Sequence, residues 1–253
     1  MRHVTATMLG ALLAMCAGPA LADTTSTPPG APCLKNNGNP CNTNNGNLGQ
    51  QGNVHGQVVV DPNPPPIDIT MPAVSDRGVY ISQIGDTSEA SVVQTAPNAY
   101  AAIYQDGSSN DADVAQSGSG TGYVMAAQSG NGNFARIQQS GDGQNVVYAS
   151  QAGNGNWMWS DQDALGAIYN GAKLTQTGNQ NDMLLYQQGS DNLALLTQDG
   201  NNNAMTAVQL GDGNRLQWTQ QGNNLSDLEI TQTGGANPGG QLLITQSNGG
   251  GGN

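Results

Sequence analysis

The chain has few charged residues and few large apolar ones. Charged residues make up 9% of its 253 residues, and Leu, Ile, Val and Phe together number 43, roughly 17%, too few for a conventional hydrophobic core. Six Lys and Arg stand against 18 Asp and Glu, a net charge of −12, which excludes a basic surface for nucleic acid or anionic lipid. The chain is therefore either disordered or folded around a different kind of core.

Residues 1–22 have the pattern of a secretory signal peptide. Arg2 and His3 precede a short apolar run, and Ala20-Leu21-Ala22 is typical of a cleavage site before Asp23. The run is too short to span a bilayer, and no later segment is apolar enough to do so. An alternative use of Cys16 as a lipidated residue is disfavoured, because Met15 stands where a small residue is expected.

Export leaves two cysteines in the mature chain, Cys33 and Cys41. In an oxidising compartment they form one small disulfide or remain as two idle thiols. Together with the single remaining histidine, His55, they are too few for a zinc centre. The sequence therefore predicts no metal site and no cofactor.

Residues 23–76 are rich in Pro, Asn, Gly and Thr, and residues 247–253 form a Gly/Asn tail. Such a composition buries too little surface to offset the entropy of ordering. We predict a flexible arm over 23–76, within which Val58–Val60 and Ile67–Ile69 are short β-like pieces able to dock onto a sheet.

From residue 77 to 246 a glutamine recurs, with nine of the fourteen intervals equal to 11 residues, three to 12 and two to 14. A fixed period of this kind is the signature of a repeat architecture. The fifteen positions are Gln83, Gln94, Gln105, Gln116, Gln128, Gln139, Gln151, Gln162, Gln176, Gln187, Gln198, Gln209, Gln220, Gln232 and Gln246.

Each glutamine ends a strand-like pattern. The residue four positions earlier is always apolar, and the residue two earlier is apolar in all cases except Ser160. The residue six earlier is Asn in nine cases, and Gly usually follows two positions later. Because side chains alternate along a strand, Asn, both apolar residues and Gln share one face, and Gly provides the turn. The nine asparagines are Asn110, Asn133, Asn145, Asn156, Asn170, Asn181, Asn192, Asn203 and Asn214.

The intervals alternate between a nearly constant turn and a variable one, so the repeating unit is two strands. One unit cannot bury its apolar face alone, whereas a stack of units can. We therefore predict an all-β fold, a two-sheet β-solenoid of about 7.5 coils with strand-turn-strand per repeat, preceded by the disordered arm.

Inward amides also favour assembly. Stacked Asn and Gln side chains satisfy one another in ladders, as in cross-β structures. The last strand, Gly240 to Gln246, carries no charge or Pro, so we expect an uncapped edge. Head-to-tail addition of further copies at such an edge yields a homopolymeric fibre.

The doubled motif S/N-x-A-x-x-x-Q-x-G-x-x-N, behind a signal peptide and a Gly/Asn-rich arm, resembles the curlin repeat of bacterial curli amyloid subunits. The resemblance implies a secreted, extracellular fibre subunit of the biofilm matrix, active in adhesion, with no enzymatic activity. It also implies export through a dedicated outer-membrane secretion pore and a companion nucleator subunit. The chain departs from the usual five units, and the two arm cysteines are not part of the pattern.

Within this family the chain is either the main subunit or the nucleator. A nucleator of the known type would end in a Lys/Arg-rich repeat, whereas the last unit, from Asn214 onward, holds one basic residue, Arg215. This favours the main subunit.

Functions of other classes remain as alternatives. An enzyme of the β-helix type needs clustered acids with basic residues or metal, but pairs such as Asp111/Asp113 and Asp161/Asp163 fall at turns or outward positions. A calcium-binding roll has a nine-residue Gly/Asp period, which differs from the period here. An ice-binding solenoid needs a flat file of outward Thr, and the Thr residues look scattered in the sequence.

The aromatic residues mostly occupy outward positions of the repeat. We expect five of them to serve lateral fibre contacts or adhesion, or only to decorate the surface, and we expect Trp218 to face inward as an oversized member of its column. The five outward residues are Tyr100, Tyr123, Tyr148, Trp157 and Trp159.

Overall fold

The computed structural model describes residues 57–61, 64–72, 78–166, 168–234 and 240–248. All regular structure within these ranges is β-strand, and no helix there is long and apolar enough to cross a membrane. The strands are β1 (Gln57–Asp61), β2 (Gly78–Ile84), β3 (Glu89–Gln94), β4 (Asn98–Asp106), β5 (Asp111–Gln116), β6 (Thr121–Asn131), β7 (Phe134–Gly141), β8 (Gln144–Asn154), β9 (Trp157–Ala164), β10 (Asn170–Thr177), β11 (Asp182–Gly189), β12 (Leu193–Asn201), β13 (Ala204–Leu210), β14 (Arg215–Asn223), β15 (Ile230–Thr233) and β16 (Gln241–Ser247).

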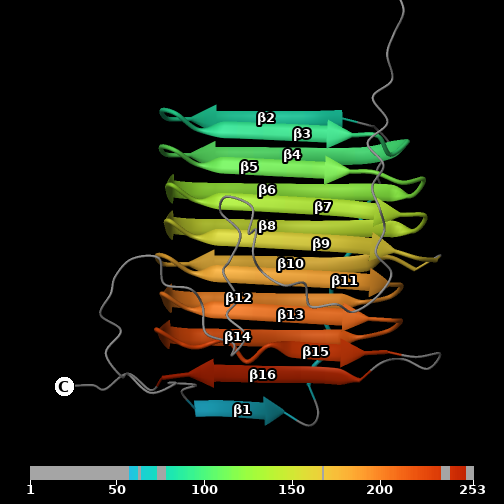
Figure 1. Ribbon diagram of the computed structural model, residues 1–253, viewed down its shortest axis with the longest axis vertical. Coiled ribbons are helices and arrows are strands. Elements are labelled where there is room, and N and C mark those ends of the chain that lie inside the picture. The colour runs from blue at the N-terminus through green and yellow to red at the C-terminus, as the bar shows by residue number, and fades with distance from the viewer. Residues whose placement is uncertain (1–56, 62–63, 73–77, 167, 235–239, 249–253) are drawn as a thin grey trace, which may run out of the picture.

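The strands form two sheets that lie face to face along one axis (Figure 1). The nine-stranded sheet has the order β1-β16-β14-β12-β10-β8-β6-β4-β2, and the seven-stranded sheet has the order β15-β13-β11-β9-β7-β5-β3. Successive strands from β2 to β16 alternate between the sheets, so each pair makes one coil and β16 makes a final half coil. The predicted two-sheet β-solenoid of about 7.5 coils is confirmed.

Neighbouring coils are parallel and in register at equivalent positions of the repeat. On β10 and β12, for example, Ala172 lies opposite Ala194 and Gln176 opposite Gln198. This register follows from the pattern, because a slip by one residue would turn every inward side chain outward.

The core is a narrow column of small and medium apolar side chains between the sheets. Ala101, Ile103, Val124 and Leu174 are fully buried, as are the larger Met183 and Leu185. The bulky Trp218 is also fully buried, stacked between Leu196 and Ile244 of the adjoining coils, and its indole N–H has no partner. A chain poor in Leu and Phe thus obtains a core by repetition.

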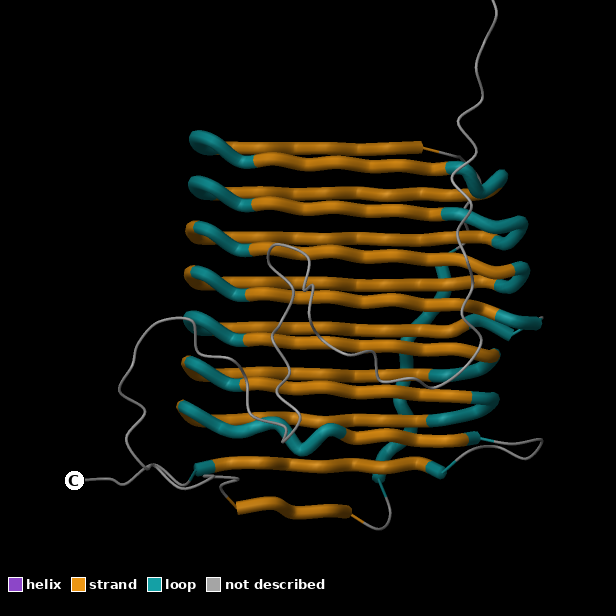
Figure 2. Tube along the Cα trace, in the orientation of Figure 1, coloured by secondary structure: helices purple, strands orange, loops and turns teal. Residues whose placement is uncertain are grey.

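Turns join the strands at the two edges of the stack (Figure 2). At Gly153 the backbone has φ +126, and a Cβ placed there would lie 1.8 Å from the carbonyl oxygen of Gly178 in the next coil. Only glycine permits both this φ and this close approach. The glycine two positions after twelve of the fifteen glutamines therefore allows the close approach of neighbouring coils.

The variable turns mark departures from the ideal coil. The 14-residue interval between Gln162 and Gln176 places Leu165 and Ile168 in an exposed turn. Before β15, Asp227 is buried, and its Oδ1 accepts hydrogen bonds from the backbone N–H groups of Thr206 and Glu229, each at 2.9 Å. These local contacts replace the strand hydrogen bonds expected there, so β15 begins only at Ile230.

Two parts of the predicted arm are folded against the solenoid. β1 pairs with β16 in antiparallel orientation, and Ile69 is buried against Val146 and Leu193. This confirms that the pieces Val58–Val60 and Ile67–Ile69 dock onto a sheet, while it corrects the expectation of a flexible arm for residues 57–61 and 64–72 and the expectation that β16 is uncapped. The signal peptide, Cys33, Cys41 and the end of the tail lie outside the described residues.

Candidate functional site: columns of stacked amides

The fifteen recurring glutamines lie in two continuous columns inside the solenoid. In each column the Nε2 of one glutamine donates to the Oε1 of the glutamine in the next coil, at 2.6 to 3.0 Å. The column on the nine-stranded sheet runs Gln83, Gln105, Gln128, Gln151, Gln176, Gln198, Gln220 and Gln246, and the column on the seven-stranded sheet runs Gln94, Gln116, Gln139, Gln162, Gln187, Gln209 and Gln232.

Each inner amide also ties one sheet to the other. The Nε2 of Gln220, for example, donates to the backbone oxygen of Ala204 at 2.7 Å as well as to Gln246 at 2.8 Å. From Gln105 to Gln220 the column glutamines are at most 3% exposed. A buried amide without partners costs about 1–3 kcal/mol, so the stack satisfies groups that a single coil would leave unpaired.

The glutamine columns have a direction. Every Nε2 points toward the C-terminal end, so the first coil ends in the Oε1 atoms of Gln83 and Gln94, which no donor among the described residues reaches. At the other end Gln246 donates to Ser226 O at 2.8 Å, and Gln232 donates to backbone oxygens of Arg215 and Gly240, each at 3.0 Å. One end presents acceptors and the other presents donors.

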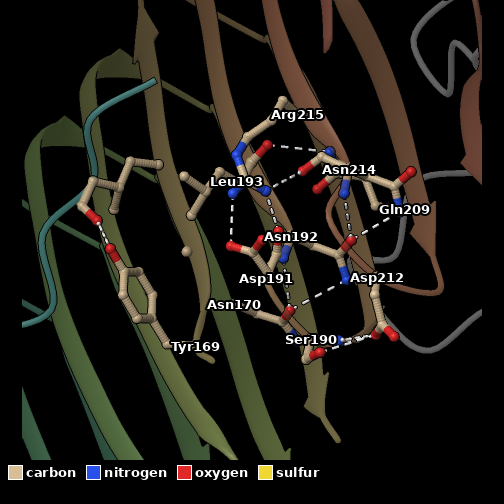
Figure 3. Close-up of polar contacts among 12 residues, drawn as sticks. Tyr169, Asn170, Ser190, Asp191, Asn192, Leu193, Gln209, Asp212, Asn214 and Arg215 are labelled. Carbon is tan, nitrogen blue, oxygen red and sulfur yellow. Dashed lines mark hydrogen bonds and ion pairs between the residues drawn. The ribbon is translucent and has the colours of Figure 1, made fainter. Parts of the chain in front are cut away.

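The predicted asparagines form two shorter columns beside the turns. Beside the seven-stranded sheet Asn110, Asn133, Asn156, Asn181 and Asn203 make an unbroken series, in which each Oδ1 accepts the backbone N–H of the next asparagine at 3.1 Å. Beside the nine-stranded sheet the same geometry links Asn170, Asn192 and Asn214 (Figure 3). These amides fix the ends of the strands rather than their centres.

Asn145 does not join its column. Its Nδ2 donates to Ser140 O at 2.8 Å, but its Oδ1 has no partner, and Asn170 in the next coil bonds to the backbone oxygens of Asp163 and Gly189 instead. The break coincides with the longer turn that leads into Asn170. An inserted turn therefore interrupts the asparagine column while the neighbouring glutamine column continues from Gln151 to Gln176.

A further column, which we did not predict from the sequence, runs along the exposed turns. Asn131, Asn154, Asn179, Asn201 and Asn223 each follow a column glutamine by three residues, and their side chains bond from coil to coil at 2.8 to 3.1 Å. The series ends at Asn248, whose Oδ1 accepts the backbone N–H of Asn223. Its sequence signal is the repeated Gly-Asn pair, which also suits an ordinary turn.

The outward aromatic residues gather in stacks on both sheets. Tyr100 and Tyr123 on the nine-stranded sheet have ring centroids 5.2 Å apart, and Tyr148 continues the series. On the seven-stranded sheet Trp157 contacts Phe134 and Trp159. Stacking of equivalent positions from coil to coil accounts for the tyrosine contacts and for the contact of Phe134 with Trp157, whereas Trp157 and Trp159 are neighbours on β9. The role of these aromatic residues in adhesion stays a prediction.

One expectation about threonine is wrong. Thr175, Thr197, Thr219 and Thr245 are not scattered but lie opposite one another in one file on the nine-stranded sheet. The next outward position of the same strands carries Asp199 and Gln221, so the file is a single line. The same position carries Ser150 on β8 and Ala127 on β6, so Thr occupies the file on four strands only.

Two acids of the repeat region form ion pairs between coils. Within the described residues no three His, Cys, Asp or Glu side chains come together as metal ligands. Asp113 pairs with Arg136 at 3.5 Å, and Asp191 pairs with Arg215 at 2.6 Å, which are ordinary cross-coil ion pairs.

Two carboxyls on the seven-stranded sheet make stability depend on pH. Burial raises the pKa of Asp182 from 3.8 to about 6, and burial together with the charge of Asp163 raises the pKa of Asp161 to about 6. Because the folded state binds these protons more tightly than the unfolded chain does, stability increases as pH falls through about 6.

We therefore expect the soluble mature protein to resist urea better at pH 5 than at pH 7.5. Lowering the pH also reduces the net negative charge of the whole protein, which raises its stability as well. The variant Asp182→Asn separates the contribution of Asp182 from this general effect. This variant should be more stable than wild type at pH 7.5, and its stability should depend less steeply on pH. Equal pH slopes for the two proteins would show that Asp182 does not carry the effect.

Comparison with known proteins points to one family. The curlin associated repeat matches residues 170–200 and 189–222, which span β10 to β14. No curated protein and no solved structure gives a significant match. The matched coils have the same strand register and the same amide columns as the coils on either side of them. Residues 170–222 are therefore similar to the curlin associated repeat, and the neighbouring coils continue the same pattern.

Proposed function

We propose that this protein is a structural subunit of an extracellular, curli-like amyloid fibre, and that it assembles by stacking the coils of successive copies head to tail. The curlin repeats and the solenoid support a structural subunit in general. The exposed apolar side chains of the first coil, and its amide oxygens left unpaired among the described residues, support head-to-tail assembly.

The open N-terminal end is the observation that carries the proposal. Val79 and Ile81 occupy the inward positions of β2 but are 49% and 42% exposed, whereas the equivalent Ala101 and Ile103 on β4 are 0% exposed. The Oε1 atoms of Gln83 and Gln94 end the amide columns at this same face. A coil of another copy placed here would bury the apolar groups and supply the missing donors.

We expect the mature chain, starting at Asp23, to form fibres with X-ray reflections near ~4.7 and ~10 Å. Ile81→Asp places a charge on the open face and should slow assembly at least about tenfold. The matched control is Val93→Asp, because Val93 is 58% exposed at an outward position of β3. A soluble monomer that persists for weeks at high concentration would refute self-assembly, and equal rates for the two variants would refute the role of this face.

Secretion and partners extend the same proposal. The likeness of residues 170–222 to the curlin associated repeat and the predicted signal peptide support export to the cell surface through an outer-membrane pore, action in a biofilm matrix, and a companion subunit. The last coils hold Arg215 alone as a basic residue, which supports the main subunit rather than the nucleator.

A further inference from the structure

Strand β1 does not belong to the repeat. Thirteen of the fourteen strand pairs among the described residues are parallel and in register, whereas β1 and β16 are antiparallel, with Val58 opposite Gln246 and Val60 opposite Ile244. No glutamine of β1 continues the amide column, and Gln246 turns its Nε2 to Ser226 O. β1 covers the edge without extending the solenoid.

β1 also has the features of a weakly held edge strand. It is five residues long, and Val58, Val59 and Val60 remain 41%, 52% and 54% exposed. Asp61 ends the strand, and prolines follow at positions 62, 64, 65 and 66. Short strands with a charge and prolines stop further pairing at a sheet edge, so β1 caps the stack while burying little surface of its own.

Residues 64–72, which we call the strap, hold β1 beside β16. The strap crosses the nine-stranded sheet (Figure 2), and Ile69 is 4% exposed in a seat formed with Val146 and Leu193. The Tyr169 hydroxyl donates to Ile69 O at 2.6 Å (Figure 3), and the Tyr148 hydroxyl donates to Thr70 O at 3.2 Å.

Glycine makes room for this seat. A Cβ at Gly171 would lie 2.7 Å from Leu193 Cδ2 and 3.2 Å from Ile69 Cγ2. The outward position of β10 is thus shaped to receive the strap, in addition to the contacts that the two tyrosines make with its backbone.

The half coil at the end fixes how a second copy continues the stack. The strands from β2 to β16 are odd in number, so unbroken alternation places β2 of the next copy on β15 and β3 of the next copy on β16. Gln83 Oε1 then meets Gln232, and Gln94 Oε1 meets Gln246. These are the acceptor and donor ends of the columns, so the two surfaces are complementary.

We propose that the edges of β15 and β16 are the docking surface for β2 and β3 of a second copy, and that β1 is a reversible cap occupying the place of that β3. The inference rests on the proposed self-assembly. In the free protein the strap keeps β1 on β16, and the cap must leave before the next copy docks.

A disulfide that locks β1 onto β16 tests the cap. Val59 and Thr245 are opposed in the antiparallel ladder, where Cα separations of about 4.5–5.5 Å suit a disulfide. We would introduce Val59→Cys and Thr245→Cys with Cys33→Ser and Cys41→Ser. Oxidised protein should elongate fibre seeds at least about tenfold more slowly than the same protein after reduction.

Ile69→Asp tests the strap by releasing it from the sheet, whereas the disulfide locks β1 in place. A carboxylate between Val146 and Leu193 should release the strap and shorten the lag of assembly severalfold. Leu165→Asp places the same charge in an exposed turn outside the strap and should leave the lag unchanged. Should Ile69→Asp fail to fold, the oxidised and reduced forms of the double-cysteine protein still decide the question.

The outcomes separate the cap from the proposed function. If the reduced protein and wild type form fibres and the oxidised protein elongates equally fast, the cap is wrong while self-assembly stands. If none of them forms fibres under any condition, self-assembly fails and the docking surface fails with it.

Discussion

Gly153→Ala should destroy the regular stack of coils, whereas Gly155→Ala, two residues away in the same turn, should be tolerated. At Gly153 the new Cβ would lie 1.8 Å from Gly178 O at φ +126, while at Gly155 the nearest atom is Gln180 Cγ at 3.8 Å and φ is +63. Alanine accepts the latter φ at a cost of about 1–2 kcal/mol. At Gly153 the clash is with backbone that cannot move aside, so we expect Gly153→Ala to lower the free energy of unfolding by more than about 4 kcal/mol.

Urea unfolding of the freshly prepared monomer, followed by circular dichroism, measures this difference. Because each repeat contacts only its neighbours, the Gly153→Ala protein should unfold in separate steps rather than in one transition. The same variant should also fail to seed wild-type fibres. Equal losses at the two glycines would show that the coil spacing is not set by the approach of Gly153 to Gly178.

Gln220→Glu should abolish folding at neutral pH, although it changes one nitrogen to oxygen. Gln220 is fully buried, accepts from Gln198 at 2.8 Å, and donates to Gln246 and to Ala204 O. A carboxylate at position 220 can still accept from Gln198, but it has no hydrogen to donate to Gln246 Oε1 or to Ala204 O. Leaving a buried charge with its partners broken costs about 3–5 kcal/mol.

Gln217→Glu is the matched control, because Gln217 lies at an outward position of the same strand β14, opposite Leu195 and Leu243 rather than an acid. It should change stability by less than about 0.5 kcal/mol. The pKa of a glutamate at position 220 would be raised by burial, so the stability it costs should be partly regained as pH falls toward 4, where the group protonates. Urea unfolding of both variants at pH 7.5 and at pH 4 measures the difference in their free energies of unfolding. A Gln220→Glu protein as stable as the control at pH 7.5 would contradict the column.

Most of the solenoid follows from the sequence because it is a local pattern repeated. Once Gln176 ends a strand and Gln198 ends an equivalent one, parallel stacking in register is the arrangement that pairs both amides and buries Leu174 and Leu196 together. The half coil follows in the same way from an odd number of repeats. These inferences use only periodicity and the need to satisfy buried polar groups.

The features that the sequence did not predict depend on contacts outside the period. The sequence predicts that Ile67–Ile69 can dock onto a sheet but not where, because the seat of Ile69 is formed by Val146, Gly171 and Leu193, which belong to three different coils. The unpaired Oδ1 of Asn145 reflects the path of one inserted turn. The exposed column that includes Asn154 was hidden because Gly-Asn also suits an isolated turn.

The structure of the assembled fibre, determined by cryo-electron microscopy, is the most direct test of stacking by amide columns. We predict parallel rungs about 4.8 Å apart, with both glutamine columns passing from Gln232 and Gln246 of one copy to Gln83 and Gln94 of the next. Each copy should add 7.5 rungs, roughly 36 Å, and should be turned by half a revolution relative to its neighbour. A fibre in which copies meet through their sides, with Gln83 and Gln94 facing solvent, would contradict this mode of assembly.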